Sequence, residues 1–203
     1  MAAVSPGPDR PGSRIVLRPA TTADLPDIQA IYAHHVRHGL ASFEEVPPDL
    51  AEITRRWLDL AGRGLPYLVA VEAGEPVPEP ILGYAYASLY RPRSAYRFTC
   101  EDSVYIRPGS EGRGIGRMLL AALVDHCTAR GFRQMVAVIG DSANAASIGL
   151  HRALGFESAG VLRAVGFKHG RWVDTVLMQR ALGPGTEHSP GFGAPGPLDT
   201  PGS

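Results

Sequence analysis

The sequence predicts a mixed α/β domain with helices on both faces of a central sheet. Strand-like and helix-like segments alternate along the chain, which is typical of this class. Residues 135–139 (MVAVI) form a continuous apolar run, the pattern of a strand buried on both faces. The strand-like residues 98–106 run through a glycine-rich loop into an amphipathic helix that precedes this run. Together these observations predict one parallel crossover in the middle of the sheet.

Local patterns predict the remaining elements. Apolar residues three and four apart indicate helices, and short runs rich in β-branched and aromatic residues indicate strands. In chain order, the predicted segments are a strand over 14–18, a helix from Thr22 as N-cap to Gly39, a helix after Pro47 and Pro48, a hairpin of strands over 67–71 and 81–87, a strand over 98–106, a helix after the loop 107–117 that ends at Gly131, a strand over 135–139, a short helix over 144–154, and strands over 160–167 and 172–179.

Length and composition bound the domain organisation. The chain has 203 residues, enough for one full domain with extensions. Residues 1–13 and 184–203 are rich in Pro and Gly and carry too little apolar surface to offset the entropy of ordering. We therefore expect two disordered tails and a folded domain over residues 14–183.

Charge and cysteine content exclude several kinds of partner. Lys and Arg (20) balance Asp and Glu (20), which argues against nucleic acid or an anionic membrane surface as a partner. No apolar run approaches the ~18–20 residues that span a bilayer, and the first thirty residues contain no signal-peptide core. Cys100 and Cys127 are too few for a disulfide scaffold or a cysteine zinc site. His34 and His38 have a metal-binding spacing but no third ligand, so we expect no metal and a cytoplasmic protein.

The glycine-rich loop (RPGSEGRGIGR) predicts a site for an anionic group. Gly112, Gly114 and Gly116 alternate where a strand meets a helix. Their backbone N–H groups can therefore turn one way, beside the positive end of the helix dipole. Arg113 and Arg117 can add charge-assisted hydrogen bonds.

The ligand of this loop has several interpretations. A nucleotide-binding P-loop requires Gly-Lys-Ser/Thr at its end, but this loop ends in Gly-Arg. A dinucleotide fingerprint requires a further glycine where Arg117 stands. The pattern x-x-x-G-x-G/A, which holds the pyrophosphate of acetyl-CoA in N-acetyltransferases, fits the loop. A glycine-rich turn without a ligand stays open as well.

The sequence resembles the GNAT superfamily of N-acetyltransferases over residues 14–182, and within it the phosphinothricin acetyltransferase family. GRGIGR and N-x-x-S…LGF are signals of the superfamily, whereas AY-x-x-T-x-E-x-x-VY and R-x-x-GFKHG-x-W-x-D are specific to the family. The stretches that carry the resemblance are ASFEEVPP (41–48), RSAYRFTCEDSVYIRP (93–108), GRGIGRMLL (112–120), GFRQMVAVIG (131–140), NAASIGLHRALGF (144–156) and LRAVGFKHGRWVD (162–174).

The resemblance implies a GNAT fold, whose mixed sheet splays open between two parallel central strands, and acetyl-CoA as co-substrate. The strand before the glycine loop would pair through its backbone with the pantetheine arm, as if the arm were another strand. The loop would hold the pyrophosphate, and an asparagine that can also cap the short helix would contact the arm or its water network. The implied coenzyme-binding residues are Val104, Tyr105, Ile106, Gly112, Arg113, Gly114, Ile115, Gly116, Arg117, Asn144 and Ser147.

Acetyl transfer to an amine requires a base for the ammonium proton and an acid for the departing thiolate. The resemblance implies Glu101 as the catalytic carboxylate. Asp102 is the competing candidate, because neighbours on a strand point to opposite faces and geometry alone does not choose between them. His151 stands where many GNAT enzymes have a tyrosine that protonates the thiolate. A histidine there can donate that proton or bind substrate.

The family acts on amino acids whose side chain carries a tetrahedral, doubly oxygenated centre, such as phosphinothricin, methionine sulfoximine or methionine sulfone. The resemblance implies acceptor contacts at Phe43, Arg93, Tyr96 and Lys168. It also implies direct transfer to the α-amino group in a ternary complex, and a homodimer. Two alternatives stay open: acetylation of another small amine or a peptide N-terminus, and a non-catalytic acyl-CoA-binding sensor. Detoxification and housekeeping acetylation would use the same pocket.

Glu111 departs from the superfamily pattern. The first position of the loop motif is usually Gln or Arg. A carboxylate beside a pyrophosphate is electrostatically unfavourable. We therefore expect Glu111 to point to solvent or to pair with an arginine.

Overall fold

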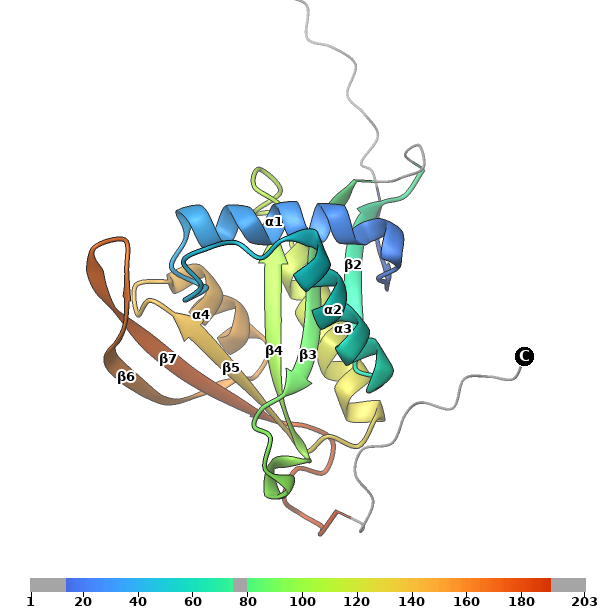
Figure 1. Ribbon diagram of the computed structural model, residues 1–203. Helices are drawn as coiled ribbons and strands as arrows, with labels where there is room; N and C mark the ends of the chain where they lie inside the picture. The colour runs from blue at the N-terminus through green and yellow to red at the C-terminus, as the bar shows by residue number, and fades with distance from the viewer. Residues whose placement is uncertain (1–13, 75–79, 191–203) are drawn as a thin grey trace, which may run out of the picture.

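A central sheet organises the chain in the computed structural model, which describes residues 14–74 and 80–190 (Figure 1). The strands within these residues are β1 (Ile15–Pro19), β2 (Tyr67–Glu72), β3 (Ile81–Leu89), β4 (Thr99–Ile106), β5 (Gln134–Gly140), β6 (Glu157–Lys168) and β7 (Arg171–Ala181). They form one sheet in the order β1-β2-β3-β4-β5-β7-β6. β4 and β5 are parallel, as predicted for the crossover, and the other neighbouring pairs are antiparallel.

Helices cover both faces of this sheet. The described helices are α1 (Leu25–His38), α2 (Leu50–Gly62), α3 (Ile115–Ala129) and α4 (Ala145–Ala153), with short 3-10 turns η1 (Thr22–Asp24) and η2 (Ser94–Tyr96). α1 and α2 lie on one face, and α3 and α4 lie on the other (Figure 1). The predicted mixed α/β class is therefore confirmed.

Each helix layer buries an apolar stripe against the sheet. On the α1/α2 face, Ile28 and Ile31 pack in one cluster with Tyr84 of β3. On the α3/α4 face, Leu120 and Leu123 of α3 pack in a second cluster that includes Met135 of β5. Burying one such side chain contributes roughly 1.5–3 kcal/mol. The two clusters hold the sheet between the helix layers.

The first helix begins later than predicted, and Thr22 is not its N-cap. Thr22 belongs to η1, and α1 starts at Leu25. The Asp24 carboxylate accepts a hydrogen bond from the Thr21 backbone N–H (2.7 Å) and two from the Arg18 guanidinium (2.7 and 2.8 Å). Thr21 and Asp24 thus form a capping box one residue before the predicted N-cap, and Arg18 of β1 adds an ion pair to it.

The sheet splays open between β4 and β5. The two strands pair only over residues 99–102 and 134–137. Beyond that point residues 103–106 pair only with β3, and residues 138–140 pair only with β7. The predicted gap between the two parallel strands is therefore confirmed.

The apolar strand β5 is not buried along its whole length. Val138 is 37% exposed, because it lies where β5 has already separated from β4. The prediction of burial on both faces is therefore wrong at this residue. At the end of β5, a Cβ on Gly140 would lie 2.1 Å from the Leu40 backbone oxygen. A glycine there lets the segment between α1 and α2 pack against the open end of the strand.

The predicted tails lie mostly outside the described residues. Residues 1–13 and 191–203 are not described, whereas residues 184–190 are. Residues 184–190 begin with two turns. The Gly185 N–H donates to the Leu182 carbonyl (2.9 Å), and the Glu187 N–H donates to the Pro184 carbonyl (3.0 Å). In residues 14–74 and 80–190, no helix is long and apolar enough to cross a bilayer.

Candidate active site

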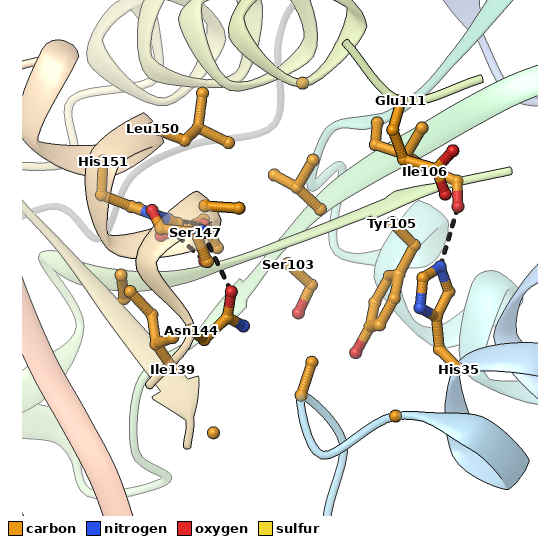
Figure 2. Close-up of a pocket in the computed structure, with 18 of the residues that line it drawn as sticks. His35, Ser103, Tyr105, Ile106, Glu111, Ile139, Asn144, Ser147, Leu150 and His151 are labelled. Atoms are coloured by element: carbon orange, nitrogen blue, oxygen red, sulfur yellow. Dashed lines mark hydrogen bonds and ion pairs between the residues drawn. The ribbon is translucent and has the colours of Figure 1, made fainter. Parts of the chain in front are cut away.

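A cavity of about 890 Å³ opens where β4 and β5 separate (Figure 2). Six parts of the chain form its wall: the end of α1 with the following segment, Tyr86 of β3, β4, the glycine loop with the start of α3, the end of β5, and α4 with the residues before it. The predicted site residues in this wall are Phe43, Glu101, Val104, Tyr105, Ile106, Gly112, Gly114, Ile115, Gly116, Arg117, Asn144, Ser147 and His151.

The glycine loop presents a helix N-terminus to the cavity. Gly112 and Gly114 have φ angles of 76° and 77°, in the left-handed region that other residues rarely adopt. Gly114 is the N-cap of α3, so the first N–H groups of that helix have no partner within the helix. Such a terminus can bind an anion. Arg117 lines the cavity, whereas Arg113 is outside its wall and pairs with Glu72 of β2.

Glu111 stays within its own turn. Its side chain is exposed, and the carboxylate accepts a hydrogen bond from the Gly109 backbone N–H (2.7 Å). No arginine in the described part of the chain forms an ion pair with it. Glu111 is exposed, as one of the two predicted alternatives has it, but it lines the cavity instead of pointing away from it.

Glu101 lies on the α1/α2 face of β4. It is half-buried and shares this face with Ser103 and Tyr105, because side chains alternate along a strand. Burial and the charge of Asp102 raise the pKa of Glu101 to about 7. A carboxylate with this pKa can take up and release protons at neutral pH.

Asp102 points to the opposite face and contacts α4. Its Oδ2 lies 2.9 Å from Nε2 of His151, and both side chains are buried. Burial works against the charged imidazole, but the hydrogen bond and charge of Asp102, with the Ser147 carbonyl, raise the pKa of His151. Asp102 is therefore engaged with His151, and Glu101 is the carboxylate that lines the cavity from the α1/α2 face of β4.

Asn144 begins α4 at the cavity wall. Its side-chain oxygen accepts a hydrogen bond from the Ser147 N–H (3.1 Å), so the predicted helix cap is present. Both residues also line the cavity. The same asparagine can cap the helix and face a ligand.

Several wall residues were not identified from the sequence. His35 of α1 donates from Nε2 to the Ile106 carbonyl (2.8 Å) and fixes the end of β4 to α1 (Figure 2). This contact joins residues 71 positions apart, so no local pattern reports it. Other wall residues that were not singled out are Leu40, Ala41, Tyr86, Ser103, Ile139 and Leu150, whereas His38 was considered only as part of a metal-binding spacing.

The segment between α1 and α2 carries Phe43 into the cavity wall. Phe43 is 39% exposed and packs against Gly166 of β6, where a Cβ would lie 2.3 Å from the ring. Lys168 does not line the cavity. It is buried, and its Nζ donates to the Ser42 carbonyl (2.6 Å). Lys168 thus holds the residue next to Phe43.

Because the resemblance implies that Phe43 contacts the acceptor, replacing Lys168 by methionine is expected to raise the KM for that acceptor several-fold and to leave the KM for acetyl-CoA unchanged. The variant leaves the Ser42 carbonyl without its donor, which costs ~1–3 kcal/mol of stability and loosens the Phe43 segment. Steady-state kinetics and thermal unfolding measure both effects. Arg163→Met, which removes an exposed cation of the same hairpin that does not line the cavity, is the control. An unchanged acceptor KM in the Lys168 variant would contradict this role.

Arg93 and Tyr96 lie outside the cavity wall. Both are exposed, and η2, which contains Tyr96, precedes β4 at the end of the strand away from the glycine loop (Figure 1). Tyr96 packs edge-on against Tyr90, with ring centroids 5.7 Å apart. Within one chain the structure does not bring these two residues together with Phe43, and their contact with an acceptor stays a prediction.

Neither cysteine lines the cavity. Cys100 and Cys127 are buried and free. The hydrogen bond with the Cys127 thiol and burial raise the pKa of the Cys100 thiol, which keeps it protonated. In residues 14–74 and 80–190, no group of three or more His, Cys, Asp or Glu side chains is arranged to hold a metal ion.

A sheet split between two parallel strands, with a glycine loop and helix N-terminus at the open end, defines an acetyl-CoA-dependent acetyltransferase. The model of the Acetyltransferase (GNAT) family matches residues 28–156, and the chain belongs to this family. The membership of the GNAT superfamily that the sequence resemblance implied is therefore confirmed.

Particular relatives narrow the comparison to one branch. The chain is 60% identical over 162 residues to a phosphinothricin N-acetyltransferase of Alcaligenes faecalis, a match that covers 80% of each chain. It is 47% identical over 169 residues to an L-methionine sulfoximine/L-methionine sulfone acetyltransferase of Pseudomonas aeruginosa, covering 83% of this chain and 95% of the relative. A phosphinothricin acetyltransferase of Sinorhizobium meliloti, solved in complex with acetyl-CoA, superposes with a TM-score of 0.84 at 50% identity and covers 91% of this chain and 97% of that one.

Proposed function

We propose that this chain transfers the acetyl group of acetyl-CoA to the α-amino group of a small amino acid with a tetrahedral, doubly oxygenated side chain. The proposed acceptors are phosphinothricin, methionine sulfoximine and methionine sulfone. The observation that carries the proposal is one cavity with Glu101 on its acceptor side and the glycine loop at its other end. The relatives' activities support the acceptor class.

The open edge of β4 supports binding of the pantetheine arm. Arg107 N–H donates to the Leu82 carbonyl of β3 (2.9 Å). The backbone N–H and C=O groups of successive residues point to opposite sides of a strand, so those of Arg107 and Tyr105 face β3. Val104 and Ile106 therefore turn theirs toward the gap, while Tyr105 supplies its ring to the wall. Of these groups, the Ile106 carbonyl already accepts from His35.

The remaining predicted residues would bind the rest of the coenzyme. Gly112, Gly114, Ile115, Gly116 and Arg117 would hold the pyrophosphate through backbone N–H groups and one guanidinium. Arg113 would reach it only after leaving Glu72. Asn144 and Ser147 would contact the pantetheine arm from α4.

Glu101 and His151 divide the proton transfers. Glu101 accepts the amine proton through water, and its pKa of about 7 supports this role. His151 gives a proton to the departing thiolate, which its raised pKa supports. Phe43 supplies an apolar contact for the acceptor, and Lys168 holds the segment that carries it. Arg93 and Tyr96 would have to reach the acceptor from outside the cavity of one chain.

Release of free thiol from acetyl-CoA tests the proposed function. We expect turnover with methionine sulfone, methionine sulfoximine and phosphinothricin, and much less with a polyamine or a peptide N-terminus. A polyamine as the best acceptor would replace the proposed substrate class. Binding of acetyl-CoA without turnover of any amine would identify a non-catalytic sensor instead.

The predicted homodimer is supported by an exposed apolar surface on the β6–β7 hairpin. Phe167 and Trp172 are 56% and 67% exposed and contact each other edge-on. Neighbouring exposed residues are Val161, Leu162 and Val165. Apolar patches of this kind mark protein–protein interfaces. Sedimentation analysis that finds a 21.6 kDa monomer would contradict the proposed homodimer.

The two free cysteines support the proposed cytoplasmic location.

A further inference from the structure

His151 uses both ring nitrogens in hydrogen bonds. Nδ1 lies 2.7 Å from the Ser147 backbone oxygen, and Nε2 lies 2.9 Å from Oδ2 of Asp102. A carbonyl oxygen can only accept, so Nδ1 carries a proton. The contact with Asp102 requires one more proton, between Nε2 and Oδ2. The pair therefore holds one transferable proton and no net charge.

The pair is buried in the wall of the cavity. The side chains of His151 and Asp102 are only 5% and 2% exposed. Oδ1 of Asp102 has no hydrogen-bond partner among the described residues. A buried charge is costly unless it is paired, so each partner stabilises the charged form of the other. Although burial alone would lower it, the pKa of His151 is raised, and this direction favours the imidazolium form beside Asp102.

Other groups near the pair do not replace Asp102. The ring of Phe156 meets His151 edge-on, with centroids 5.0 Å apart. Cys100 shares the face of Asp102 and stays neutral, because Cys127 and burial raise the pKa of its thiol. The charged groups on the surrounding elements are Glu101 on the opposite face of β4, Glu111 and Arg117 at the glycine loop, Arg152 on α4, and Arg180, which donates to the Leu154 carbonyl.

We propose that Asp102 is a positioning residue for the leaving-group acid: it orients His151 and keeps its Nε2 proton in place until the thiolate forms. This inference rests on the proposed function and adds a residue to it. Glu101 and Asp102 are neighbours on β4 and point to opposite faces. One strand therefore carries the base on its acceptor face and the partner of the acid on its coenzyme face.

The protons balance over one turnover. The α-ammonium first loses a proton to solvent. The amine nitrogen then attacks the thioester carbon, its N–H proton passes through water to Glu101, and the C–S bond breaks. The proton shared by Nε2 and Oδ2 goes to the thiolate, since Nδ1 is held by Ser147 within α4. The pair is left with one negative charge, and solvent returns its proton while Glu101 releases its own.

Asp102→Asn tests the proposal, because it keeps the shape of the side chain and removes its charge. Neutral His151 then accepts from the asparagine amide, and burial lowers the pKa of His151. An acid must be protonated to act, so the alkaline limb of the kcat profile should move to lower pH. We expect kcat at about pH 8 to fall ~10-fold or more, with the KM for acetyl-CoA within about twofold. Asp125→Asn, an exposed carboxylate on α3, is the matched control.

A spectroscopic measurement separates this inference from the proposed function. Nitrogen-15 NMR of histidine-labelled protein at neutral pH should find both nitrogens of His151 protonated in the wild type and only Nδ1 protonated in the Asp102→Asn variant. An unmoved alkaline limb, or His151 doubly protonated in the variant, would overturn the role of Asp102. So would a singly protonated His151 in the wild type, even if the variant failed to fold. A lack of turnover with every acceptor would overturn the proposed function while the NMR result still decides on Asp102.

Discussion

Replacing Glu101 by glutamine is expected to lower kcat by roughly 10²–10⁴, the range for the loss of a general base. Glutamine keeps the size of the side chain but cannot accept a proton. The KM for acetyl-CoA should change little, because Glu101 lies on the face proposed for the acceptor and the glycine loop follows the opposite end of β4. Steady-state kinetics with methionine sulfone measure both quantities.

A matched control and the pH profile sharpen this prediction. Glu157→Gln, an exposed strand glutamate outside the cavity wall, should keep full activity. In the wild type, kcat should rise through about pH 7 as Glu101 loses its proton. Full activity of the Glu101 variant would contradict the assignment and turn attention to Asp102.

The Glu101→Gln variant should be more stable than the wild type above neutral pH. Burial and the Asp102 charge raise the pKa of Glu101 from 4.5 to about 7, so the folded state holds this proton more tightly than the unfolded state. Stability is therefore lost as pH rises between these two values. Glutamine removes that cost, so its Tm should exceed the wild-type Tm at pH 8 but not at pH 4. Thermal unfolding at both pH values measures this reversal.

Local sequence patterns predicted the elements of the fold because each is set by its own periodicity. The strand over 135–139 and the helix after the glycine loop are both found within a few residues of their predicted bounds. Thr22 is not the N-cap because the capping box lies one residue earlier, at Thr21 and Asp24, and a 3-10 turn precedes α1. The gap beside β4 followed from the family resemblance and not from any periodicity.

The candidate site needed contacts that link distant parts of the chain. The sequence placed Glu101 and Asp102 on opposite faces, but it did not show that Asp102 meets His151, 49 residues later. Lys168 was predicted to bind the acceptor, yet it lies 126 residues from the Ser42 carbonyl that it holds. Such pairings depend on how α4 and β6 pack, and a one-dimensional pattern does not contain that information.

Replacing both Gly112 and Gly114 by alanine is expected to weaken acetyl-CoA binding by roughly 30-fold or more. A Cβ at either position would meet nothing within 4 Å, so space is not the obstacle. The obstacle is the left-handed backbone, with φ near 76° at both positions. An L-residue there costs ~1–2 kcal/mol, and every 1.4 kcal/mol is tenfold in affinity. Relaxed alanines would turn the loop N–H groups away from the pyrophosphate.

The matched control is the pair Gly74→Ala and Gly131→Ala. Both glycines have φ near 88° and equally open surroundings, but neither lines the cavity. Both double variants should therefore lose similar stability in thermal unfolding. Only the loop variant should lose affinity in calorimetric titration with acetyl-CoA. The two glycine pairs share a similar backbone strain and differ in whether they line the cavity. Equal affinities of the two double variants for acetyl-CoA would therefore mean that the backbone of the glycine loop does not hold the coenzyme.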